Sequence, residues 1–127
     1  MNKKLKTLAL AALLGVSSLA LADIADDMDI IADNYASALK ADNAGDFQQS
    51  LQKMRAAALD SRQKTPPVLD GKAEDSAEMK DYRHGMDILI GQIDQAQALA
   101  NQGKLEDAKR LARDFKQTRD LYHKKYR

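Results

Sequence analysis

The sequence has 127 residues, of which 44% are apolar, 31% charged and 5% aromatic. Twenty Lys and Arg residues nearly balance 19 Asp and Glu residues, so no basic surface argues for nucleic-acid binding. The absence of cysteine excludes disulfides, zinc-thiolate sites, iron–sulfur clusters, a Cys nucleophile and a covalently attached c-type haem. Two prolines, six glycines and few β-branched residues favour one helical domain.

Residues 1–22 have the pattern of a secretory signal peptide. Three lysines fall within the first six residues, an apolar run covers residues 8–14, and small residues end the segment. We expect cleavage after Ala22, with Ala20 as the alternative. The apolar run is shorter than the roughly 20 residues of a membrane span. The mature chain, residues 23–127, is therefore expected in the periplasm without membrane insertion, with 17 basic and 19 acidic residues.

Apolar residues recur every three or four positions in the first half of the mature chain, which predicts two amphipathic helices. The first follows Asp23, a possible N-cap, and ends near Ala41. The second ends before Thr65-Pro66-Pro67, because a residue that precedes proline is disfavoured in the helical region. The predicted apolar stripes are Ile24, Met28, Ile31, Tyr35, Ala38 and Leu39, and then Phe47, Leu51, Met54, Ala58 and Leu59.

Two further helices are predicted in the second half of the chain. The third starts at Asp75 or Ser76 and ends at Asn101-Gln102-Gly103, and internal Gly85 and Gly91 weaken its signal slightly. The fourth runs from about Lys104 to the C-terminus. Their stripes are Met79, Tyr82, Met86, Leu89 or Ile90, Ile93, Ala96 and Ala100, and then Leu105, Ala108, Ala112, Phe115, Arg119, Tyr122 and Tyr126.

The alternation of three- and four-residue spacings is typical of left-handed helix packing. Two short connections and one of moderate length, residues 64–75, suit an antiparallel arrangement. The sequence therefore predicts an all-α fold, an antiparallel up-down-up-down four-helix bundle.

This topology places Met28 and His123 at the same end of the bundle. Met28 lies about four residues into the first helix and His123 four residues before the C-terminus. At ~1.5 Å per residue, both are roughly 6 Å from that end, although 95 positions separate them. A thioether and an imidazole form an axial pair used by electron-transfer haem proteins. Considered without the other, Met28 is better explained as a residue that fills the hydrophobic core, and His123 as a histidine near a helix C-terminus, where the helix dipole favours it.

Other residues are expected around the same layer. Tyr82, Met86 and Met54 supply apolar surface above it, and Pro66-Pro67 closes one side of a slot. Arg119 and Arg127 either meet haem propionates or are ordinary solvated arginines, and the residues favour neither reading.

A di-iron site is the competing metal hypothesis. Asp81-x-x-His84 and Asp120-x-x-His123 are both acid-x-x-His patterns on helices. Di-iron bundles, however, also require Glu residues from the other two helices, and the first two predicted helices contain none. His84 also lies two residues from Tyr82 and Met86, which turns it away from the core stripe. We therefore expect His84 to face solvent, and we expect no di-iron centre and no catalytic triad.

From Ala22 onward the chain resembles the soluble periplasmic cytochrome b562 family. The resemblance rests on long ordered segments: ADIADDM (22–28), KMRAAALD (53–60), TPP (65–67), EMKDYRHGMDILIGQID (78–94) and YHKKYR (122–127). It covers the whole mature chain.

The resemblance implies one non-covalent haem b with Met28 and His123 as axial ligands, in the up-down-up-down topology for which this family is a known example. It also implies that Tyr82 and Met86 line the haem. The family tends to have Phe at both positions, so the sequence departs from it there.

Iron with two strong axial ligands has no open position for a substrate, so the resemblance implies one-electron transfer to and from a redox partner protein rather than an enzyme. Nothing in the sequence names that partner, and nothing requires more than a monomer. The alternative is a haem-free helical periplasmic module that binds other molecules or acts as a chaperone. It explains the leader and the apolar stripes equally well, but it does not predict a Met and a His in one layer.

Overall fold

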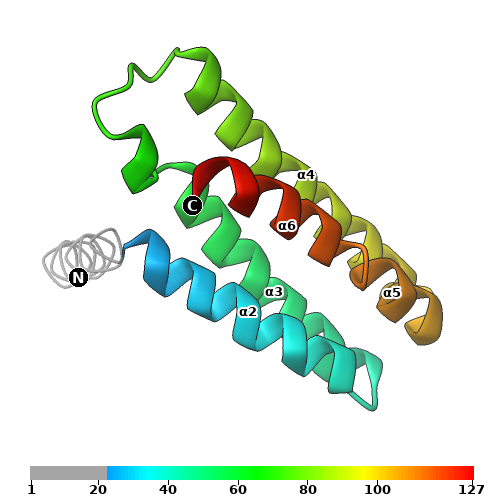
Figure 1. Cartoon of the computed structure of the whole chain (residues 1–127). Coiled ribbons are helices and arrows are strands. Elements are labelled where there is room, and N and C mark those ends of the chain that lie inside the picture. The colour runs from blue at the N-terminus through cyan, green and yellow to red at the C-terminus, as the bar shows by residue number, and fades with distance from the viewer. Residues whose placement is uncertain (1–22) are drawn as a thin grey trace, which may run out of the picture.

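The computed structural model describes residues 23–127, so the predicted signal peptide lies outside the described residues (Figure 1). The described residues form α-helices and one 3₁₀ turn and contain no strand. In chain order the elements are α2 (Ile24–Lys40), α3 (Ala44–Arg62), η1 (Pro67–Leu69), α4 (Ala77–Asn101), α5 (Leu105–Ala112) and α6 (Phe115–Tyr126). Within residues 23–127, no helix is both long enough and apolar enough to cross a bilayer.

Side-chain caps and a glycine define the helix ends much as the sequence predicts. The Asp23 carboxylate accepts a hydrogen bond from the N–H of Asp26 at 2.9 Å, at the start of α2. Ser76, not Asp75, caps α4, because its hydroxyl accepts from the N–H of Met79 at 3.2 Å. Gly103 has φ of 76°, the left-handed conformation that suits glycine just after a helix.

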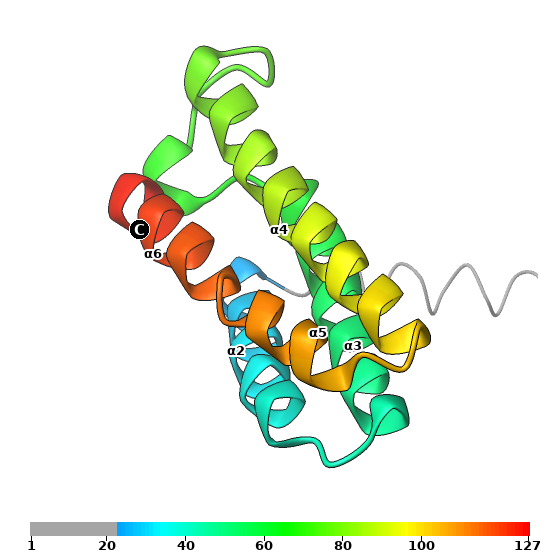
Figure 2. The same cartoon turned by 90° about the vertical axis from the view of Figure 1, so that its right-hand side faces the viewer.

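The last predicted helix is divided into two, so the expectation of one continuous helix is wrong. The chain forms tighter i to i+3 hydrogen bonds at the junction: the N–H of Asp114 donates to the carbonyl of Leu111 at 3.0 Å, and the N–H of Gln117 donates to that of Asp114 at 3.1 Å. Arg113 and Asp114 nevertheless keep right-handed helical angles. α6 therefore follows on from α5 with only a local interruption (Figure 2).

The helices pack in sequence as an up-down bundle, as predicted. α3 contacts α2 and α4, and α4 contacts both α5 and α6. α2 completes the bundle mainly through contacts with α5, whereas α6 packs against α4. The main core includes Ala38, Phe47, Leu51, Met54, Ile93, Ala96, Ala108 and Phe115, all nearly inaccessible to solvent.

A second, smaller core closes one end of the bundle. Leu69 from η1 packs with Met79 and Tyr82 of α4, and Ile24 and Tyr126 contact this cluster. Both ribbon views place η1 beside the C-terminal end of α6 (Figures 1 and 2). The start of α2, the end of α6 and the long connection therefore meet at this end, as the topology predicts.

Candidate functional site

A large cavity lies between α2 and α6 at the end of the bundle closed by the second core. Its volume is about 1120 Å³, slightly above the roughly 300–1,000 Å³ typical of small-molecule sites. α2 packs on α5 more than on α6, which it meets through the rings of Tyr35 and Phe115, 6.0 Å apart. The space beside the rest of α6 is lined by side chains from several elements. Its lining includes Ile24, Met28, Ile31, Tyr35, Met54, Pro66, Pro67, Tyr82, Met86, Leu89, Phe115, Arg119, Tyr122, His123, Tyr126 and Arg127.

Met28 and His123 both line this cavity, from α2 and α6 respectively. Met28 is half-buried and packs against the main core, one turn beyond the capped start of its helix. His123 is also half-buried and lies in the last turns of α6. The structure thus brings together two potential iron ligands that are 95 positions apart in the sequence.

The environment of His123 favours its neutral form. Burial lowers the pKa of the imidazole below its usual 6.5, and the positive charges of Arg127 and Arg119 lower it further. Asp120 opposes this shift more weakly. His123 is therefore uncharged at pH 7, which is the form in which histidine ligates a metal.

Tyr82 and Met86 line the cavity from α4, and Met54 lines it from α3. Tyr82 is 4% exposed, so its hydroxyl needs a hydrogen-bond partner. It donates to the backbone carbonyl of Ser61 at 2.7 Å, and the Ser61 hydroxyl lies 2.9 Å from the phenol oxygen. Ser61 is fully buried at the end of α3. The tyrosine therefore tethers α4 to α3 beside the cavity while its ring contributes to the wall.

The cavity also has charged residues and prolines at its rim. Arg119 and Arg127 both belong to its lining, and so do Pro66 and Pro67 on the opposite connection. The Arg119 guanidinium bonds to the neighbouring Asp120 at 3.0 Å. Two cations, one on α6 and one just beyond its end, are thus available to an anionic group in the cavity, although Arg119 already has an acidic partner.

Directly next to Met28, Asp27 is a buried carboxylate that the sequence did not single out. It is 3% exposed, and the ammonium of Lys64 lies 3.6 Å from its Oδ2. Burial and the nearby Asp60 carboxylate raise the pKa of Asp27 to about 6. Lys64 approaches Asp60 more closely, at 2.6 Å, and that hydrogen bond holds the pKa of Asp60 below its usual value. The group joins the start of α2 to the end of α3.

Comparison with known proteins agrees with this architecture. The family model described as cytochrome b562 matches residues 23–127. A protein of Yersinia pestis described as "Probable soluble cytochrome b562 2" is 57% identical over 128 residues, all of both chains. A second Yersinia pestis protein, "Probable soluble cytochrome b562 1", is 42% identical over 84% of each chain. An uncharacterised protein of Pasteurella multocida is 31% identical over the full length of both.

The chain belongs to the cytochrome b562 family. Membership of this family implies a haem electron carrier and not an enzyme. It also disfavours the alternative of a haem-free helical module.

The structure also bears on the rejected di-iron hypothesis. His84 is exposed on α4, as the spacing predicted, and is absent from the cavity lining. Within residues 23–127, no group of three or more His, Asp or Glu side chains is arranged to hold a metal ion. Of the two histidines in the chain, His123 therefore lines the cavity and His84 does not.

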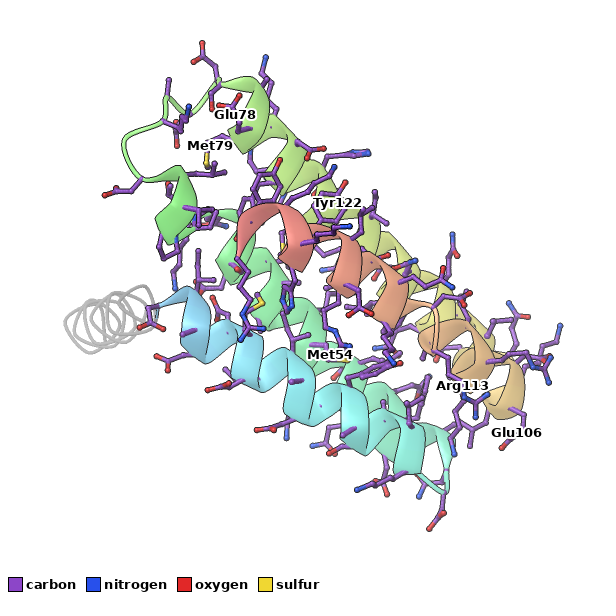
Figure 3. All side chains as sticks on the ribbon, in the orientation of Figure 1. Met54, Glu78, Met79, Glu106, Arg113 and Tyr122 are labelled. Atoms are coloured by element: carbon purple, nitrogen blue, oxygen red, sulfur yellow. The ribbon has the colours of Figure 1, made fainter. Side chains whose placement is uncertain are left out.

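Sequence reasoning missed the contacts that hold α6 against α4. The ring of Tyr122 lies directly over Gly85, and the hydroxyl of Tyr126 donates to the carboxylate of Asp81 at 2.5 Å. The ammonium of Lys125 also reaches Asp81, at 3.1 Å. Figure 3 labels Tyr122 where α6 meets α4. The only signal for these contacts was an unexplained glycine inside a helix.

Proposed function

We propose that the mature chain carries one non-covalent haem b in the periplasm, ligated by Met28 and His123, and transfers single electrons as the iron cycles between ferric and ferrous states. The observation that carries the proposal is the presence of these two side chains in one cavity. Membership of the cytochrome b562 family supports the nature of the cofactor.

The residues of the cavity fit a haem. Its volume of about 1120 Å³ suits a large planar ligand, and most of its lining is apolar. The thioether of Met28 and the neutral imidazole of His123 would hold the iron, while Arg119 and Arg127 would meet the propionates. When bound, haem supplies a one-electron couple, and a thioether ligand raises its potential relative to stronger donors.

The chain's own residues would keep this chemistry to electron transfer. With Met28 and His123 both holding the iron, no open position would remain for oxygen or substrate. The lining from α3 and α4, which includes Met54, Tyr82 and Met86, would exclude water from the ring. The half-exposed residues of α6 would leave a route by which a redox partner protein could approach the haem, and a monomer would suffice for this function.

The ligand assignment is tested by reconstituting the haem-free protein with haemin and recording its absorption spectra. The parent is expected to show the sharp reduced bands of a six-coordinate b-type haem. Met28→Leu, which keeps an apolar side chain of similar volume, and His123→Ala should each give a five-coordinate or high-spin spectrum. The controls are Met79→Leu and His84→Ala, which change a Met and a His outside the cavity lining and should retain the parental spectrum. Parental spectra for both ligand variants would refute the assignment.

The attachment and the location of the haem have separate tests. With no cysteine in the chain, acid acetone should extract all haem from the polypeptide, and haem that stays bound would refute the b-type assignment. The leader pattern and a family match that begins at residue 23 support export. The purified periplasmic protein should be red, with a mass that corresponds to loss of residues 1–22. A colourless protein from haem-sufficient cells would instead support the haem-free module.

A further inference from the structure

Gly85 lies where the Tyr122 ring of α6 packs against α4. It is buried in the middle of α4, where glycine costs helix stability relative to alanine. A Cβ placed on Gly85 would lie 2.4, 2.5 and 2.7 Å from Cδ1, Cε1 and Cγ of the Tyr122 ring. Real side chains do not approach so closely, so any larger residue at position 85 would force the ring, and the helix that carries it, to move.

The contact lies within a row of contacts that fixes α6 along α4. On one side of it, the Thr118 hydroxyl donates to the side-chain carbonyl of Gln92 at 2.9 Å. On the other side, the Tyr126 hydroxyl donates to Asp81. Positions 118, 122 and 126 are one helical turn apart, so they share one face of α6. The Gly85–Tyr122 contact is the middle one of the three, and it is the one in which a ring lies directly against the backbone of α4.

His123 follows Tyr122 directly, so its side chain leaves α6 about 100° around the helix axis from the ring. Tyr122 therefore constrains the rotation of α6 and its distance from α4, together with the contacts of Thr118 and Tyr126, and both quantities affect where the imidazole of His123 lies. α2, which carries Met28, meets α6 near its first residue, where the rings of Tyr35 and Phe115 lie 6.0 Å apart. Further along α6, towards His123, the three contacts described above are all with α4. The width of the cavity between the two helices thus depends on the contact with α4.

From these observations we infer that Gly85 is a positioning residue for His123: the absence of a side chain lets the Tyr122 ring lie against α4 and holds the imidazole at the correct distance from Met28. The inference rests on the proposed ligation. Gly91 provides the matched comparison, because it lies in the same helix and a Cβ there would meet nothing within 4 Å. The same Gly-to-Ala change is therefore expected to weaken haem binding at position 85 but not at position 91, six residues away.

The first experiment compares Gly85→Ala and Gly91→Ala after reconstitution with haemin. Gly91→Ala should retain the parental haem affinity and the six-coordinate spectrum. Gly85→Ala should bind haem at least tenfold more weakly and show a high-spin component, because His123 is displaced from the iron. Ile93→Val, a core change outside the cavity lining, controls for loss of stability alone and should leave the spectrum unchanged. A Gly85→Ala protein with the parental affinity and spectrum overturns the inference.

A double variant tests whether the effect passes through the Tyr122 ring. Tyr122→Ala removes the ring that the new methyl group would meet. In that background, adding Gly85→Ala should change haem affinity by less than twofold, whereas it costs at least tenfold in the parent. An undiminished effect of Gly85→Ala without the ring would contradict the inference.

Amide hydrogen exchange of the haem-free protein separates this inference from the proposed function. Gly85→Ala should lower protection of the α6 amides at least tenfold, while Gly91→Ala should not lower it. If Met28→Leu and His123→Ala leave the haem spectrum unchanged, the proposed ligation fails, whatever the exchange data show. If those variants behave as proposed but Gly85→Ala leaves α6 protection unchanged, only the present inference fails.

Discussion

The buried hydrogen bonds of Tyr82 allow a stability change to be worked out from the structure. Tyr82→Phe removes a hydroxyl that donates to the Ser61 carbonyl at 2.7 Å, and it leaves that carbonyl and the Ser61 hydroxyl without this partner. A net hydrogen bond contributes about 0.5–1.5 kcal/mol, and an unsatisfied buried group costs about 1–3 kcal/mol. We therefore expect a loss of roughly 1–2 kcal/mol in the free energy of unfolding, equivalent to roughly 5–10 °C in Tm.

The assay is urea unfolding of the haem-free protein, followed by far-ultraviolet circular dichroism. Tyr126→Phe is the matched control: it removes a hydroxyl from a partly exposed tyrosine, and Asp81 keeps Lys125 as a partner at 3.1 Å. It should cost less than about 1 kcal/mol. Adding Ser61→Ala to Tyr82→Phe should recover part of the loss, because it removes the unpaired hydroxyl. A Tyr82→Phe protein as stable as the parent would refute this account of the Ser61 contact.

Three further outcomes follow from the site. Burial raises the pKa of Asp27 to about 6, so the folded state binds its proton more tightly than the unfolded state, and stability falls as pH rises from about 4 to 6. Asp27→Asn should therefore raise the free energy of unfolding by roughly 1–3 kcal/mol at pH 7.5 and little at pH 3.5, measured by urea unfolding at both values. Because the pKa of His123 lies below 6.5, haem affinity should be constant between pH 8 and 7 and then fall about tenfold per unit below that pKa, in spectroscopic titrations. Haem at 100 times its Kd should raise the free energy of unfolding by about 2.7 kcal/mol, and an unchanged Tm would contradict binding to the folded state.

The helices were predictable where their ends carry a local signal. Asp23 caps α2 through its own side chain, and Gly103 adopts a positive φ just beyond α4, so neither end depends on distant residues. The interruption between α5 and α6 had no such signal. Arg113 and Asp114 keep helical angles, and the apolar spacing from Leu105 to Tyr126 continues unchanged through the junction.

The parts of the site that follow from the direction of the helices could be predicted from the sequence. Met28 and His123 could be assigned to one end of the bundle because antiparallel helices of known length fix that end. The pairing of Asp27 with Lys64, and of Tyr82 with Ser61, depends instead on side-chain positions between helices distant in sequence. In the sequence, Asp27 is simply one of two acidic residues in the first turn of a helix, where acids are common.

The cavity takes its two facing walls from α2 and α6, the first and last helices of the described chain. In the proposed ligation, this arrangement determines when haem can be captured as well as where. If the chain is exported from its N-terminus as proposed, Met28 would emerge long before His123, and the site would be complete only when synthesis and export had finished. Haem loading would then mark only folded chains that extend at least to His123, and a chain that ends before His123 would lack one of the two proposed ligands.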